Sequence, residues 1–308
     1  MKLFLKRTVP FLLAVAAFVA VVVVGVGVVD LRSYYRSLMA PEGVDVLVCN
    51  DSQCAFGLDP AGFPRMWNKS AVASPCEASY MRLRDVLAHN PNRFNYVVID
   101  VSQVHIGMDD RLRPLCCDGQ VNDHALLALW NILEFPRRLG SLGGLFTGLF
   151  LKHADDIRSA LRHKKPYLAP ICGGYQVMTI AGFREHPEAA LADLREKARP
   201  TARMRTDERC VWWFRKMAAC AVAAGARPVF MTTPLHPKFR EAIDPGRLAS
   251  VVVVAGDLAA EFKTVHLNYL GVDFGDGCWQ DCNHLNVWGA RELTKRFRKD
   301  IEGLKEDE

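Results

Sequence analysis

The stretch VDVLVCNDSQCAFGLDP, residues 44–60, changes from an apolar run to a polar turn within a few positions. Four of its first five residues are apolar and three of them are valine, a composition typical of a buried β-strand. Asn50, Asp51 and Ser52 follow, and these residue types favour turns. Ser52 is therefore either a nucleophile held above a strand end or a residue that only ends the strand.

The rest of the chain repeats this alternation of short apolar runs and helical stretches. Residues 77–90 and 207–226 have helical periodicity. Continuous apolar strands between helices indicate an α/β fold, with a mostly parallel sheet covered on both faces. The predicted strands are 44–49, 64–68, 95–101, 166–172, 227–232 and 250–254.

Hydroxyl residues follow four of the strand regions, namely Ser52, Ser70, Ser102 and Thr233. In a parallel sheet the carboxyl ends of the strands share one edge, where binding sites form. We expect these four side chains to gather along that edge.

The N-terminus carries a second strong signal. Three basic residues lie within the first seven, and residues 9–29 then contain no charged side chain. As a helix this run would be about 30 Å long, the thickness of the bilayer's hydrocarbon core. A cleaved secretory signal is the alternative, but its apolar region is usually only about 7–15 residues. We expect an uncleaved anchor with the basic end in the cytoplasm and the chain from Asp30 outside.

Composition limits the remaining function classes. Half of the 308 residues are hydrophobic, and the net charge of +5 is too small and too scattered to indicate nucleic-acid binding. Ten cysteines fit an oxidising compartment. Cys278, Cys282 and His284 leave a zinc site open, but disulfides or buried thiols are the preferred interpretation. We expect no metal and no organic cofactor.

Residues 103–165 interrupt the alternation of strands and helices. The segment is mainly helical and partly amphipathic, and its run 142–151 is too short to span a membrane. We interpret it as an insertion that either packs on the domain or forms a lid or partner-facing element.

Asp281 and His284 stand three positions apart near the C-terminus, before a stretch with the pattern of a closing helix, 286–297. A carboxylate on one imidazole nitrogen fixes the tautomer and leaves the other nitrogen free as a general base. A serine hydroxyl needs such a base within hydrogen-bond reach. Ser52 and this pair are predicted to meet at the same edge of the sheet.

These residues also carry a family resemblance. VCNDSQCAFGLDP resembles the first block of the SGNH hydrolase superfamily, usually Gly-Asp-Ser, and DCNHLNVWGA resembles its last block, Asp-x-x-His. MWNKSAVASPCEASYMRLRDVL and TTPLHPKFR resemble intervening segments of its membrane-anchored members. The resemblance covers roughly residues 43–300. It implies a three-layer, flavodoxin-like sandwich with a catalytic domain at 43–304.

The resemblance assigns roles to individual residues. Ser52 matches the nucleophile, His284 the base and Asp281 the residue that orients it, and the Ser52 N–H would donate to the oxyanion. Asn50 replaces the first-block glycine, and DVSQVH at 100–105 replaces the third-block Gly-x-Asn. Ala73 is one position near the second-block glycine. The candidate oxyanion and substrate-binding residues are Asp51, Ser74, Ser102 and Gln103.

Four further side chains near these segments are structural by default. His105 and His124 flank the insertion. His236 follows a predicted strand and is the strongest of the four as a site residue. Trp279 is expected to pack in the interior rather than to stack on a sugar.

The expected layout is a cytoplasmic 1–8, an anchor 9–29, a linker 30–42, the catalytic domain 43–304 and a tail 305–308. Relatives of this branch acylate cell-envelope polymers beside membrane-bound O-acyltransferases. The resemblance therefore implies a single-pass inner-membrane protein with a periplasmic esterase or acyltransferase domain, a polysaccharide or other acylated envelope polymer as substrate, and such an acyltransferase as partner. The alternative is an inactive SGNH-like protein that binds a polymer or that partner.

Overall fold

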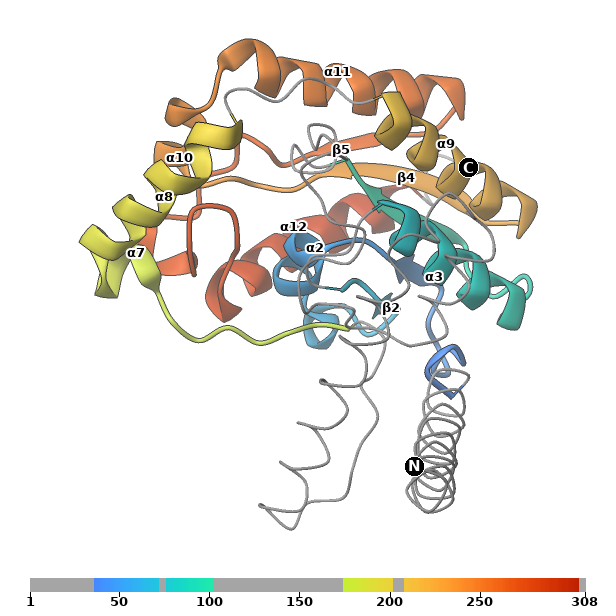
Figure 1. The fold of residues 1–308 in the computed structure, drawn as a ribbon. Helices are drawn as coiled ribbons and strands as arrows, with labels where there is room; N and C mark the ends of the chain where they lie inside the picture. Colours follow the sequence, from blue (N-terminus) through green and yellow to red (C-terminus); the bar gives the residue numbers. More distant parts are fainter. Residues whose placement is uncertain (1–35, 72–75, 102–173, 202–207, 305–308) are drawn as a thin grey trace, which may run out of the picture. The chain divides into compact units, whose positions relative to one another are not determined.

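The computed structural model describes residues 36–71, 76–101, 174–201 and 208–304 (Figure 1). The chain divides into two units, residues 1–37 with 114–172 and residues 38–113 with 173–308. Nearly all described residues belong to the second unit, which is the one considered below. The predicted anchor 9–29, insertion 103–165 and strand 166–172 lie outside the described residues. Among the helices that are described, none has the length and apolar character needed to cross a membrane.

Five parallel strands form one sheet (Figure 1). They are β1 (Val46–Val48), β2 (Met66–Asn68), β3 (Tyr96–Asp100), β4 (Arg227–Thr232) and β5 (His266–Asn268). Their spatial order is β2-β1-β3-β4-β5, and Val46 of β1 pairs with Met66 of β2 and Tyr96 of β3. The predicted α/β class with a parallel sheet is confirmed. Because the chain leaves β1 first to one side and then to the other, a crevice is expected at the carboxyl ends of β1 and β3.

One strand prediction is wrong. Residues 250–254 belong to helix α11 (Pro245–Glu261) rather than to a strand. Asp244 caps this helix by accepting from the Arg247 N–H, and Pro245 occupies its first turn. The buried residues of α11 recur at helical spacing, whereas Val253 is more than half exposed. The missed strand, β5, is only three residues long.

The three predicted helices are present as α3 (Cys76–His89), α9 (Glu208–Ala223) and α12 (Val287–Gly303). Apart from α11, the other described helices, all shorter than α9 and α12, lie among the strands and these helices in the chain. These are α2 (Ser52–Gly57), η1 (Pro60–Gly62), α7 (Gly182–Glu185), α8 (Pro187–Thr201), α10 (Pro237–Ala242) and η3 (Asp276–Cys278).

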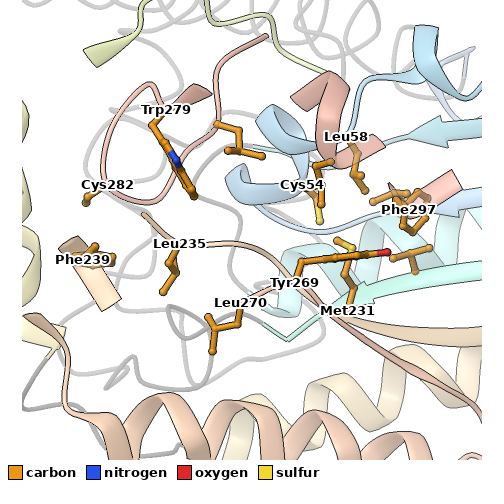
Figure 2. Close-up of a cluster of buried hydrophobic side chains, with 14 of the residues drawn as sticks. Cys54, Leu58, Met231, Leu235, Phe239, Tyr269, Leu270, Trp279, Cys282 and Phe297 are labelled. Atoms are coloured by element: carbon orange, nitrogen blue, oxygen red, sulfur yellow. The ribbon is translucent and has the colours of Figure 1, made fainter. Parts of the chain in front are cut away.

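Alternating strand residues form two buried layers. Val46, Val48, Val98 and Met231 belong to a cluster that also contains Phe297 of α12 and Cys54 of α2 (Figure 2). The strand residues between these, which face the other side of the sheet, are also fully buried. On that side α9 contacts β3 and β4, and α3 packs on α9. Helices therefore cover the sheet from both sides, which is why its strands are almost uniformly apolar. The intervening residues are Leu47, Val97, Ile99 and Phe230.

Candidate active site

The turn after β1 places Ser52 at the start of a helix. Asp51 caps α2 in an extended conformation, and its carboxylate accepts a hydrogen bond from the Gln53 N–H at 3.0 Å. The Asp51 carbonyl then accepts from the Ala55 N–H. This strand–turn–helix arrangement fixes Ser52 as the first residue of α2, at the carboxyl edge of the sheet.

Asn50 joins this turn to the neighbouring strands. Its side-chain amide donates to the Val98 carbonyl at 2.9 Å, and its backbone N–H donates to Ser70 Oγ at 3.1 Å. Asn50, Val98 and Ser70 are all buried. Leaving one of their polar groups without a partner would cost about 1–3 kcal/mol of folding free energy. A glycine here could make only the second bond. Asn50 therefore has a structural function in this chain, because it ties the turn before Ser52 to two neighbouring segments.

The loop before α12 presents His284. The two carboxylate oxygens of Asp281 have separate functions, because Oδ1 accepts from the backbone N–H groups of Asn283 and His284 while Oδ2 lies 2.9 Å from His284 Nδ1. An isolated bridge between Trp279 and Leu285 closes the loop behind them. The local backbone thus fixes both the carboxylate and the ring.

Close backbone packing holds this loop in place. The Gly182 N–H donates to the Trp279 carbonyl at 2.9 Å, and a Cβ at Gly182 would collide with the Gln280 carbonyl oxygen. A Cβ at Gly289, in the first turn of α12, would collide in the same way with the Cys278 carbonyl. Both positions therefore require glycine for the loop to lie where it does.

The structure brings Ser52, His284 and Asp281 together from positions 232 residues apart. His284 Nε2 lies 2.9 Å from Ser52 Oγ. Since Nδ1–H donates to Asp281, Nε2 carries the lone pair that can accept the serine proton. The ring of Phe56 meets the imidazole edge to face at 5.0 Å. The His284 and Asp281 side chains are 17% and 24% exposed, so the relay is partly accessible.

The oxyanion candidates are only partly described. The Ser52 N–H heads α2 and makes no hydrogen bond within the described part of the chain, so it is available as a donor. Asp51 is buried and its carboxylate caps α2, so it supports the turn that carries Ser52 and does not lie on an open surface. The other sequence-predicted positions, Ser74, Ser102 and Gln103, lie outside the described residues, as do Ala73, His105 and His124.

His236 lies in a separate pair. It is buried, its ring stacks on Phe183 at 3.7 Å, and its Nδ1 accepts from the Lys238 N–H at the start of α10. Its Nε2 lies 3.1 Å from Asp276 Oδ1. Burial lowers the pKa of His236, which favours the neutral ring. This histidine serves packing and capping.

Trp279 is fully buried, so its ring cannot stack on a polymer. Figure 2 shows its side chain as part of the buried hydrophobic cluster. Its indole ring meets His236 and Phe274 edge to face. The expectation that Trp279 packs in the interior is confirmed.

The described cysteines are free thiols, including Cys278 and Cys282, so no disulfide joins that pair. Burial raises the pKa of the Cys54 thiol well above its ordinary value, which favours the protonated, less reactive thiol. Within the described ranges, the one group of side chains close enough to share an ion is Asp193, Asp281 and Cys282. The zinc alternative would require His284 in this group, but His284 does not belong to it.

Sequence reasoning placed Ser70 and Thr233 at this edge but missed Gln53 and Asp100. Thr233 Oγ1 donates to Gln53 Oε1 at 2.9 Å and lies 3.5 Å from Asp100 Oδ1. A carboxylate at the end of the apolar run YVVID was the available signal for Asp100.

No protein-family model matches the chain, and no curated protein matches it in sequence. The function must therefore be inferred from the residues at the carboxyl edge of the sheet and from the distances between them.

Proposed function

We propose that this chain is a serine esterase or O-acyltransferase that uses Ser52 as nucleophile, His284 as general base and Asp281 as the carboxylate that orients the base. The observation that supports it is the continuous relay of two 2.9 Å hydrogen bonds from Ser52 Oγ through the imidazole to Asp281. Each residue type alone is common at strand ends and in loops. Their alignment in one relay is what acyl transfer requires.

The first half of the reaction forms an acyl-enzyme. Ser52 Oγ attacks the carbonyl carbon of an acyl ester while its proton moves to His284 Nε2. Asp281 stabilises the resulting imidazolium through Nδ1–H. The Ser52 N–H can donate to the oxyanion of the tetrahedral intermediate, as the first free N–H of a helix. His284 then returns the proton to the leaving alcohol, and the acyl group remains on Ser52.

The second half transfers the acyl group. His284 deprotonates a water molecule or a sugar hydroxyl, which attacks the acyl-serine, and the proton then returns to Ser52. Water gives an esterase, and a sugar hydroxyl gives an acyltransferase. We propose cell-envelope polysaccharide as the acylated polymer.

The fold supports placing the domain with SGNH hydrolase-like proteins. The strand order β2-β1-β3-β4-β5 is the flavodoxin-like order, with a switch point between β1 and β3. Ser52 follows β1 at that switch point, and helices contact both sides of the sheet as in a three-layer sandwich. The proposed family is thus supported by motif, strand order and position of the nucleophile.

The apolar run 9–29 supports a single-pass inner-membrane anchor with the domain in the periplasm. Such a tether would confine Ser52 to the membrane surface, where envelope polymers are acylated. A membrane-bound O-acyltransferase is the proposed partner, as donor of the acyl group.

The test is covalent labelling by a fluorophosphonate, which reacts with activated serines. We expect the chain to be labelled on Ser52 and the Ser52→Ala variant to remain unlabelled. Ser70 is the internal control, because it also follows a strand but is buried and accepts from the Asn50 N–H. Trypsin cleavage after Arg65 and Lys69 places the two serines in different peptides.

Label on another residue, or equal label on Ser52→Ala, would disprove the assignment of the nucleophile. A folded chain that takes no label would favour the alternative, an inactive SGNH-like protein that binds a polymer or an acyltransferase.

A further inference from the structure

A buried polar cluster lies directly behind the Ser52–His284 pair. Its members come from three parts of the sheet edge, namely Gln53 in α2, Thr233 after β4 and Asp100 at the end of β3. All three are at least 95% buried. Polar groups in such surroundings are costly unless they bond to one another, so their contacts define one arrangement rather than several.

Gln53 connects the two halves of the proposed relay. It follows the nucleophile directly, and its Nε2 donates to the Asn283 carbonyl at 3.4 Å. Asn283 precedes His284, and its own N–H donates to Asp281 Oδ1 at 3.0 Å. A single side chain therefore joins the nucleophile turn to the loop that carries the base and its carboxylate.

The Asn283 carbonyl fixes which way the Gln53 amide points. A carbonyl oxygen can only accept, so the Gln53 atom that faces it must be the donor Nε2. Gln53 Oε1 then faces Thr233, whose hydroxyl donates to it at 2.9 Å. An amide rotated by 180° would lose the bond to Asn283.

Asp100 lies at the other side of the Thr233 hydroxyl. Burial and the nearby charge of Asp51 raise the pKa of Asp100 well above its ordinary value, while hydrogen bonds from Thr233 act in the opposite sense. The hydroxyl lies 3.5 Å from Asp100 Oδ1 but 2.9 Å from Gln53 Oε1, so its single proton is directed mainly to Gln53.

We propose that Gln53 is a positioning residue for the acyl transfer, held by Thr233, and that it sets the distance between Ser52 Oγ and His284 Nε2. The inference rests on the proposed function, because it concerns the same pair of reacting groups. Gln53 does not bond to either reacting atom; it acts through Asn283 and the 281–284 loop. A displacement of about 1 Å between reacting groups can cost about 10²-fold in rate.

The experiment measures fluorophosphonate labelling of the 308-residue chain in detergent, with the inactivation rate constant separated from the probe's binding constant. Thr233→Val removes the hydroxyl at nearly constant volume and leaves Gln53 Oε1 unpaired. We expect the rate constant to fall about tenfold or more while probe binding is unchanged. Gln53→Glu, which cannot donate to the Asn283 carbonyl when ionised, should lower it in the same way.

Two variants separate positioning from general loss of stability. Thr233→Ser retains the hydroxyl and should restore labelling to within about threefold of the wild-type rate. Thr294→Val is the matched control, because Thr294 is also fully buried and its hydroxyl also makes a hydrogen bond. That bond is accepted from the Asp59 N–H and involves neither the relay nor Gln53. It should lower the melting temperature but not the rate constant of the folded fraction.

The outcomes distinguish this inference from the function on which it rests. Wild-type rate constants in both Thr233→Val and Gln53→Glu would overturn the positioning role while Ser52 remained the nucleophile. The same would follow if Thr294→Val lowered the rate as much as Thr233→Val at equal loss of stability. Failure of the wild-type chain to label at all would instead overturn the proposed function.

Discussion

Two histidines in the C-terminal half of the chain each contact a carboxylate, at similar distances but through different ring nitrogens. His284 Nδ1 lies 2.9 Å from Asp281, and His236 Nε2 lies 3.1 Å from Asp276. The difference lies on the other ring nitrogen. In His284 it faces the hydroxyl of Ser52, whereas in His236 it accepts from the backbone N–H of Lys238.

The two pairs also differ in how far solvent reaches the histidine ring. The His236 ring is stacked and only 1% exposed, while its partner Asp276 is 56% exposed. Both members of the His284 pair are partly accessible and are fixed by their own loop. A histidine–carboxylate pair is therefore not itself a sign of catalysis. What the second nitrogen faces, and whether a substrate can reach it, decides the role.

Replacing each histidine in turn tests this contrast most strongly. His284→Ala should lower kcat for an activated aryl acetate on the order of 10⁵–10⁶-fold, because Ser52 would lose the proposed general base. His236→Ala should leave kcat of the folded fraction within about threefold, since its ring contacts no member of the relay. Steady-state kinetics, corrected for the folded fraction by circular dichroism, measures both. A comparable loss of kcat in the two variants would invalidate the distinction between the pairs.

The carboxylates give the next largest difference. In Asp281→Asn the new amide would donate to His284 Nδ1 and leave the proton on Nε2, so the ring would present a donor to Ser52 rather than an acceptor. We expect kcat to fall on the order of 10⁴-fold. Asp276→Asn retains an acceptor oxygen at an exposed position and should change kcat by less than about twofold. Stopped-flow measurement of acylation checks both; equal rates in Asp281→Asn and wild type would contradict the orienting role of Asp281.

The sequence was informative where a signal was local and poor where it depended on distant residues. The apolar run into Asn50, Asp51 and Ser52 predicted β1 and its turn, and the Asp-x-x-His spacing predicted a pair that the loop backbone assembles by itself. The valines at 251–254 misled because β-branched residues favour strands, whereas here a capped helix holds them and buries Val251 on its apolar face.

The cluster behind the relay could not be predicted, because its contacts join residues far apart in the chain. Gln53 and Asn283 are separated by 230 positions, and Gln53 and Thr233 by 180. Nothing in the neighbours of Gln53 indicates that its amide turns inward. That direction follows from the course of α2 between the sheet and the loop, which only the assembled fold defines.

The smallest effect concerns the dependence of stability on pH. Burial lowers the pKa of His236 below its unfolded value, so the unfolded chain binds more protons as the pH falls through that range. The contribution of His236 is thus complete above about pH 6.5 and is lost as the pH falls towards 5, with a slope of at most about 1.4 kcal/mol per pH unit.

His236→Asn keeps an acceptor for the Lys238 N–H but cannot titrate. It should be less stable than wild type by about 1–2 kcal/mol at pH 7.5, because the stacking on Phe183 is lost, and the difference should shrink at pH 5. Urea unfolding at both pH values measures this. The lowered pKa of His266 contributes equally to both proteins and cancels in the difference. A difference that grows as the pH falls would mean that folding favours the protonated ring of His236, and would contradict the lowered pKa.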